Sequence, residues 1–268
     1  MMQTMGGRRI VLMGAAAAVA VLAFLWQTGW LGRPGTQAPE PVVAAPAQPP
    51  ASQPALPPLE PEAPAAPLAA ADVAGALTEL LGRTALVVTD DFPRRFVATV
   101  DNLGRAHAPP LMWPVTPTAG KFTVQEEGGS AVIAADNGAR YTPFVLLAEG
   151  VDAAAAVQLY ARMYPLLQAA YLELGFPGKS FHRRMVEVID LLLATPRPPD
   201  PLPVQLVEVK GTVASQQPWV RYEYADPALE SLSAGQKILL RVGPENQRRL
   251  KAKLAELRAE LLRGAPRR

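Results

Sequence analysis

The polar residues whose types and spacing suit chemistry lie in two similar ten-residue stretches, RRFVATVDNL at residues 94–103 and RRMVEVIDLL at residues 183–192. In the second stretch, Arg183, Glu187 and Asp190 follow one another at steps of four and three residues, which places them on one face of a helix. Carboxylates and guanidinium groups on such a face are suited to ion pairing, anion binding or general acid–base catalysis. The same face therefore has three interpretations.

Asp101 and Asp190 are the most informative of these residues because each lies in the last turn of its predicted helix. The helix dipole disfavours a negative charge in that position. We therefore expect each carboxylate to accept hydrogen bonds from an arginine, a tyrosine hydroxyl or the N-terminus of another helix. In this interpretation the residues are structural pairs.

A second interpretation assigns the arginines of both stretches to a shared anion-binding groove. It predicts that changing Arg94 and Arg183 to glutamate abolishes binding and leaves the melting temperature nearly unchanged. The complete set of candidate binding residues is Arg94, Arg95, Asp101, Arg183, Arg184, Glu187 and Asp190.

The remaining motifs predict no catalytic, metal or cofactor site. The sequence GKS at residues 178–180 ends like a phosphate-binding loop, but Glu173 stands where that motif requires its first glycine, and a helix precedes it. The two histidines, His107 and His182, have no metal-binding spacing. The chain also lacks cysteine, which excludes thiolate chemistry and disulfides.

The two stretches belong to a longer match, in which residues 92–115 align without a gap with residues 181–204. A constant offset of this kind is typical of an internal repeat. We therefore expect a globular domain at residues 71–263 with two pseudo-repeats, about residues 72–165 and 166–262, each a helix–helix–hairpin–helix unit. The predicted fold class is α+β, mainly helical.

Alternating apolar residues predict two β-hairpins in this domain. The first is KFTVQEEGGSAVIAA at residues 121–135, which turns at Gly128-Gly129. The second combines VQLVEV at 204–209 with WVRYEY at 219–224. Between the first hairpin and the next helix, Asp136-Asn137-Gly138 predicts a turn.

Two helices are expected to supply buried stripes. One begins after Asp152 and contains Pro165, which should kink or divide it. The last helix follows a capping box of Ser233 and Gln236 and a Gly-Pro break, and its leucines have coiled-coil-like spacing. It packs either on its own domain or on a second chain. The two stripes are Val157, Tyr160, Tyr164, Leu167, Tyr171 and Leu174, and Leu250, Leu254, Leu257 and Leu261.

The N-terminal part of the chain predicts a membrane anchor. Arg8 and Arg9 precede an uninterrupted apolar run that ends at Trp26, long enough to cross a hydrocarbon core. Positive charge on the N-terminal side places residues 1–9 in the cytoplasm and the rest outside. We expect a transmembrane helix at residues 10–30, because bulky residues occupy the zone where a signal peptide would be cleaved.

Residues 31–70 are rich in proline and alanine and show no hydrophobic periodicity. Such a segment is expected to be disordered and to act as a semi-rigid spacer that reaches on the order of 110 Å when fully extended. A short tail, residues 264–268, is expected at the other end.

Four segments resemble an uncharacterised proteobacterial family, the domain of unknown function 3014. They are RRFVATVDNL, LYARMYPLLQAAYLELGFP, RRMVEVIDLLLATPRPP and YEYADPALESLSAGQKILLRVGPEN. The resemblance covers roughly residues 77–262, and it implies a single-pass anchored protein with a Pro-rich spacer. It implies no activity and no catalytic residues.

These observations predict an inner-membrane protein with its C-terminal domain in the periplasm, which binds or scaffolds an envelope protein or cell-wall component. From Pro244 onward, eight Lys or Arg stand against three Glu, so the last helix also suits anionic lipid head groups or an acidic partner. The periplasmic location argues against nucleic acid, and no cofactor is predicted. The alternatives are a carboxylate-based enzyme that acts on an envelope polymer and a structural homodimer through the last helix. The pattern favours a protein that is not an enzyme.

Overall fold

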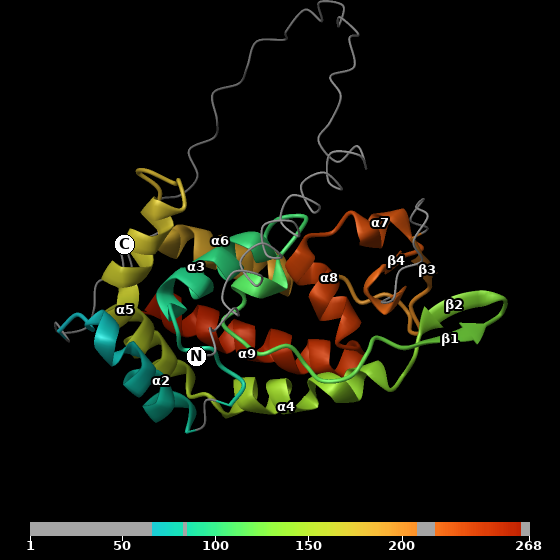
Figure 1. The fold of residues 1–268 in the computed structure, drawn as a ribbon, viewed down its shortest axis with the longest axis horizontal. Helices are drawn as coiled ribbons and strands as arrows, with labels where there is room; N and C mark the ends of the chain where they lie inside the picture. Colours follow the sequence, from blue (N-terminus) through green and yellow to red (C-terminus); the bar gives the residue numbers. More distant parts are fainter. Residues whose placement is uncertain (1–65, 83–84, 208–217, 264–268) are drawn as a thin grey trace, which may run out of the picture. The chain divides into compact units, whose positions relative to one another are not determined.

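The computed structural model describes residues 66–82, 85–207 and 218–263 (Figure 1). The predicted cytoplasmic segment, the transmembrane helix at residues 10–30, most of the linker at 31–70 and the tail at 264–268 lie outside these residues. Within the described ranges, no single helix has the length and hydropathy needed to cross a membrane. Two consecutive helices, α4 (Asn137–Gly150) and α5 (Ala153–Glu173), pass that test only as a pair bent by 81°.

The described residues form a mainly helical α+β fold, as predicted. Its helices are α2 (Val73–Leu81), α3 (Phe92–Leu103), α4 (Asn137–Gly150), α5 (Ala153–Glu173), α6 (Phe181–Leu193), α7 (Pro227–Glu230), α8 (Ala234–Arg241) and α9 (Pro244–Arg263). Short 3₁₀ turns are η1 (Ala70–Asp72), η2 (Pro110–Met112) and η3 (Pro218–Val220). The strands are β1 (Val124–Glu127), β2 (Ser130–Ile133), β3 (Val204–Leu206) and β4 (Tyr222–Tyr224).

Both predicted hairpins are confirmed as two-stranded antiparallel sheets, β1–β2 and β3–β4. Gly128 and Gly129 turn the first hairpin with φ values of 60° and 82°, a region that glycine enters without strain. The hairpins lie side by side in Figure 1 because the Ile133 N–H donates to the Leu202 carbonyl at 2.9 Å. A small core under them contains Ile133, Leu202, Val204, Tyr224, Leu229 and Leu240.

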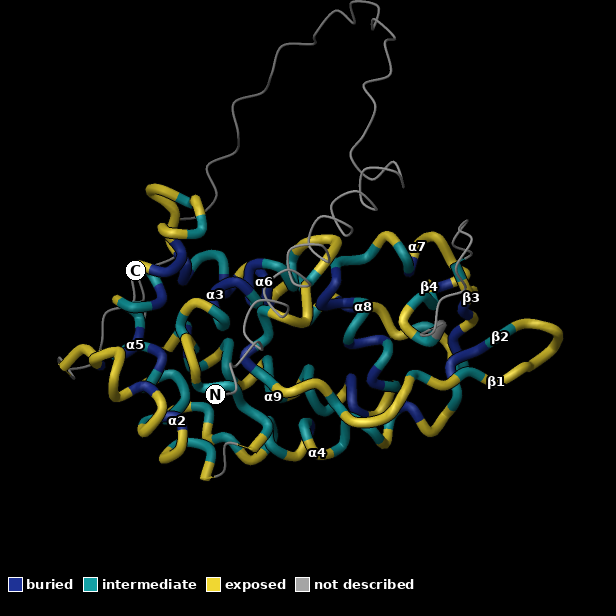
Figure 2. Tube along the Cα trace, viewed as in Figure 1, coloured by how far each residue is buried: buried dark blue, intermediate teal, exposed yellow. Residues whose placement is uncertain are grey.

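The larger core lies between α3, α5, α6 and α9, and Figure 2 shows buried segments of these helices in dark blue. The predicted stripe of α5 is confirmed, since Tyr160, Leu167 and Tyr171 are buried and the other stripe residues pack against the same core. Pro165 lies inside α5 and does not divide it. A proline at this position removes one hydrogen bond, and packing on both sides of it maintains the helix.

Helix α9 packs on its own domain, against α4, α5, α6 and α8. Leu250 and Leu254 are partly buried against the larger core, and Leu261 belongs to it. The predicted leucine seam therefore faces the chain's own helices, and this arrangement gives no support to pairing of α9 with a second chain.

The chain turns at Asp136-Asn137-Gly138 as predicted, with the Ala139 N–H donating to the Asp136 carbonyl at 3.1 Å, but the turn continues into α4, a helix that was not predicted. The sequence did not predict this helix because it contains Gly138 and Pro143, and both residue types have poor helix propensity. The buried Asn137 side chain fixes the helix start against the first hairpin: its Oδ1 accepts from the Thr123 N–H at 3.1 Å, and its Nδ2 donates to the Ala134 carbonyl at 3.0 Å.

The expected duplication is not supported by the arrangement of the elements. The boundary after residue 165 falls inside α5, and two helices, α7 and α8, lie between the second hairpin and α9 where α4 alone lies between the first hairpin and α5. The aligned ends also differ, because Val204 pairs within the β3–β4 hairpin whereas Val115 makes an isolated bridge to Val87. The matched helices α3 and α6 instead pack against each other.

Candidate functional site

The α3–α6 contact brings predicted residues of both stretches together in one charge network. The buried carboxylate of Asp101 accepts hydrogen bonds from Arg184 Nε at 2.9 Å and from Arg105 Nε at 2.7 Å. Arg184 Nη2 also donates to the Asp101 carbonyl oxygen at 2.9 Å. The carboxylate near the end of α3 is therefore neutralised by two guanidinium groups.

Gly104 makes room for this network. A Cβ atom at that position would lie 2.7 Å from Arg184 Nη2 and 3.2 Å from Val188 Cγ2. The absence of a side chain thus lets the Arg184 guanidinium lie across the end of α3. Phe96 meets Phe181 one turn into α3, with ring centroids 6.1 Å apart.

Asp190 pairs with a different partner, Arg258 of α9, whose Nη2 donates to Oδ2 at 3.2 Å. The pairing expected for both aspartates is confirmed, but the surroundings differ: the Asp190 side chain is 47% exposed and that of Asp101 is 8% exposed. The Glu187 side chain is exposed, and its Oε2 lies 3.9 Å from Arg184 Nη1. An ion pair that is open to water contributes little to the free energy of unfolding. We therefore expect only the Asp101 network to contribute appreciably to the stability of the domain.

The four arginines proposed for an anion-binding groove do not share one role. Arg95 donates to the carbonyl oxygens of Asp90 and Leu111, and Arg184 is committed to Asp101. The Arg94 and Arg183 side chains make no hydrogen bond or ion pair with other residues that the structure describes. The groove remains a hypothesis for Arg94 and Arg183 alone.

A largely apolar cavity of about 410 Å³ lies within the helical part of the domain, lined by α2, α3, α4, α5, α6 and α9. Its walls include Leu77, Phe96, Leu147, Ala156, Met163 and Leu257. Phe96, Leu147 and Leu257 are only partly buried although they face this space. The volume is within the range of small-molecule pockets.

This space is partly open to solvent, and water that enters it finds few hydrogen-bond partners along the apolar wall. Covering that wall with an apolar group is favourable, at about 25 cal/mol per Å² of apolar surface removed from water.

Tyr160 contributes the one side chain with a hydroxyl among the described lining residues of the cavity. Its hydroxyl lies 3.3 Å from Nδ1 of the buried His182, and the ring of Tyr164 lies edge-on to the His182 ring. Burial lowers the pKa of His182, which favours the neutral imidazole, and burial raises the pKa of Tyr160. Both groups are therefore uncharged at neutral pH.

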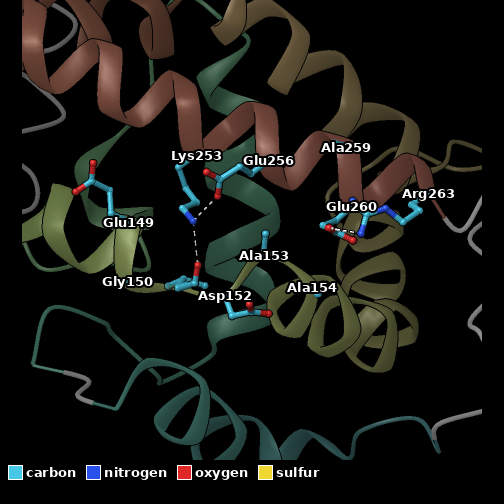
Figure 3. A pocket seen from close by; sticks show the side chains of 11 residues that line it. Glu149, Gly150, Asp152, Ala153, Ala154, Lys253, Glu256, Ala259, Glu260 and Arg263 are labelled. Carbon is cyan, nitrogen blue, oxygen red and sulfur yellow. Dashed lines mark hydrogen bonds and ion pairs between the residues drawn. The ribbon is translucent and has the colours of Figure 1, made fainter.

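A polar cleft of about 550 Å³ lies where the α4–α5 corner faces α9 (Figure 3). Lys253 reaches across it, donating to the Val151 carbonyl at 3.1 Å and pairing with Glu256. The Asp152 carboxylate accepts from the Ala155 N–H at 2.7 Å and caps α5. The charged residues of the cleft are Glu149, Asp152, Glu256, Glu260, Lys253 and Arg263.

The basic residues of α9 are engaged within the domain rather than presented as a cationic face. Arg249 pairs with Glu149, which lowers the pKa of that carboxyl. Lys251 donates to the Thr195 carbonyl at 2.9 Å, and Arg258 pairs with Asp190. This arrangement does not favour the predicted use of the last helix against anionic lipid head groups.

Sequence reasoning did not predict the cavity or the cleft. The stripes of α5 and α9 that line the cavity were visible as periodic apolar residues, but an ordinary core has the same periodicity. In the described part of the chain, no three His, Asp or Glu side chains converge as metal ligands.

The fold and these sites define a class of protein, a mainly helical α+β domain with an apolar cavity beside a polar cleft. Residues 92–258 match the family described as "Protein of unknown function (DUF3014)", and the chain belongs to this family. The family identified from the sequence is thus confirmed. No curated protein and no solved structure gave a significant match to the chain.

Proposed function

We propose that the chain is a single-pass inner-membrane protein whose folded domain, on the periplasmic side, binds an apolar group of an envelope partner in the cavity. Arg8 and Arg9 before the apolar run support the anchor and its orientation. The Pro- and Ala-rich linker sets the reach of the domain, and tethering raises its effective concentration for anything within that reach.

The cavity is the observation that carries this proposal. An apolar space of about 410 Å³ that is partly open to solvent is large enough for a small ligand or a group inserted from a partner. Of the three carboxylates considered for catalysis, Asp101 and Asp190 accept hydrogen bonds from arginines, and Glu187 lies exposed 3.9 Å from Arg184. Carboxylates engaged by guanidinium groups within the fold favour binding over catalysis.

The test is photo-crosslinking in intact cells that produce the full chain. A photoreactive amino acid replaces Leu257, which lines the cavity, or Leu172, which is exposed elsewhere on α5. We expect one dominant adduct from position 257 and none of the same mass from position 172. Equal labelling from both positions would reject the cavity as the binding site.

A cavity-filling variant provides the matched control. Ala156→Phe places a ring in the cavity and should abolish the adduct from position 257, with a melting temperature that is unchanged or raised because a void is filled. Ala169→Phe makes the same substitution at an exposed position of α5 and should leave the adduct intact. An adduct that persists in Ala156→Phe would contradict the proposal.

A further inference from the structure

We infer that the cavity and the polar cleft form one site for an amphiphile, with an aliphatic chain in the cavity and an uncharged or cationic head group in the cleft. This inference rests on the proposed function and adds the chemical class of the ligand. It is carried by the position of the two spaces and by the side chains that line each of them.

The cavity selects a group that needs no hydrogen bonds. Leucine, valine, phenylalanine and methionine side chains dominate its walls, and the Tyr160 hydroxyl is within reach of His182. A polar group placed there would lose its hydration without gaining a partner. Met163 and Met185 can adjust to a flexible chain because methionine side chains have several accessible rotamers. An aliphatic chain fits these requirements.

The cleft adjoins the cavity at Val151, which lines both spaces. Helix α9 supplies both linings from neighbouring positions: Leu254 and Leu257 face the cavity, whereas Lys253 and Glu256 face the cleft. The α4–α5 corner also lines both spaces. Leu147 and Ala148 face the cavity, whereas Glu149 and Asp152 face the cleft. A molecule that spans the two spaces therefore has one apolar end and one polar end.

The charges of the cleft indicate the kind of head group. Four carboxylates and two cations line it, and both cations are paired within the cleft, Lys253 with Glu256 and Arg263 with Glu260. Of the other two carboxylates, Glu149 pairs with Arg249 and Asp152 caps α5. Lys253 is already engaged by the Val151 carbonyl and Glu256. A negatively charged head group such as a free carboxylate would therefore find both lining cations already paired, whereas an ammonium or hydroxyl group would find carboxylate oxygens as acceptors.

The experiment uses cells that produce the full chain and incorporate a fatty acid with a diazirine in its chain and a terminal alkyne. After irradiation, adducts are enriched through the alkyne and mapped to peptides by mass spectrometry. We expect adducts on peptides of α5 and α9 that line the cavity in the unchanged protein and in Ala169→Phe, and their loss in Ala156→Phe. Adducts on peptides from residues 10–30, the proposed transmembrane segment, serve as the control for labelling by bulk membrane lipid.

The mass of each adduct identifies the head group. An amine- or hydroxyl-bearing lipid supports the inference, whereas a free fatty acid or an acylated protein in the cavity overturns it. Cavity adducts that persist unchanged in Ala156→Phe also overturn it. If the probe at position 257 captures a protein and the cavity gives no lipid adduct, the proposed function stands and this inference fails. If neither experiment gives a cavity adduct, both fail.

Discussion

Asp101 and Asp190 occupy the same position in two matching stretches of sequence and have different surroundings in the fold. Asp101 lies buried between α3 and α6 and accepts from two arginines, whereas Asp190 is on the surface and pairs with α9. The sequence predicted that each needed a partner, because a carboxylate at the end of a helix is unfavourable. It did not identify these two partners, because Arg184 is 83 residues from Asp101 and Arg258 is 68 residues from Asp190.

Removing the charge of Asp101 should therefore be much more harmful than removing that of Asp190. Asp101→Asn leaves Arg184, which is 23% exposed, without its counter-charge, and we expect it to lower the free energy of unfolding by about 2 kcal/mol. Asp190→Asn is the matched control and should change it by less than about 1 kcal/mol. Urea unfolding of both variants measures the difference. Similar losses in the two variants would contradict the role of the Asp101 network.

His182 should make stability depend on pH. Burial lowers its pKa in the folded state, whereas the unfolded chain protonates it near its ordinary pKa of about 6.5. The full stability is therefore present above about pH 6.5 and declines as the pH falls, because the unfolded state then binds more protons. The slope contributed by one such group is at most about 1.4 kcal/mol per pH unit.

The measurement compares melting temperatures at pH 7.5 and pH 5.5. His182→Asn keeps an acceptor near the Tyr160 hydroxyl but does not titrate, so we expect a smaller decrease than in the unchanged protein. His107→Asn changes an exposed histidine and should leave the decrease unchanged. If His182→Asn has the same pH dependence as the unchanged protein, the imidazole is not responsible.

At the level of elements, α8 begins where the ends of α3 and α6 meet. The Ala234 N–H donates to the Arg105 carbonyl at 2.7 Å, and Gln236 Nε2 donates to the Leu191 carbonyl at 3.1 Å. Gly235 lies between these contacts, and a Cβ atom there would be 2.9 Å from the Leu103 carbonyl oxygen. Since that neighbour is backbone, it cannot move aside without shifting α3.

Gly235→Ala should therefore destabilise the domain by about 1–3 kcal/mol, the usual cost of overpacking. Gly75→Ala in α2 is the control, because nothing lies within 4 Å of its added Cβ and alanine is the better helix former. We expect that control to gain up to about 1 kcal/mol. Denaturant unfolding of the two variants gives the comparison, and a neutral Gly235→Ala would show that the three helix ends are less tightly packed than described.

Elements with local sequence features were predictable, and those determined by tertiary contacts were not. The first hairpin follows from Gly128-Gly129, and the capping box of Ser233 and Gln236 is present. Helix α4 was not predicted because its stability comes from contacts that are distant in sequence. Asn246 of α9, for example, donates to the Gly138 carbonyl at 2.8 Å.

For the molecule as a whole, the sequence predicted the fold class and the helical core but not the void within it. Periodicity shows which face of a helix is apolar and gives no measure of how completely several such faces fill the space between them. The repeat was misleading for a related reason. Similar stretches form similar helices, but the matching aspartates differ: Asp101 of α3 is buried, whereas Asp190 of α6 pairs with α9 at the surface.

Helix α9 follows every other described element and is the shared partner of α4, α5, α6 and α8. During synthesis these four helices have no surface against which to complete their burial until the residues beyond about 250 have been added. We therefore expect the nascent chain to remain without a finished core until late in translation. If the domain acts on the far side of a membrane, as proposed above, this delay would keep the polypeptide in the extended state that passes through a translocation pore.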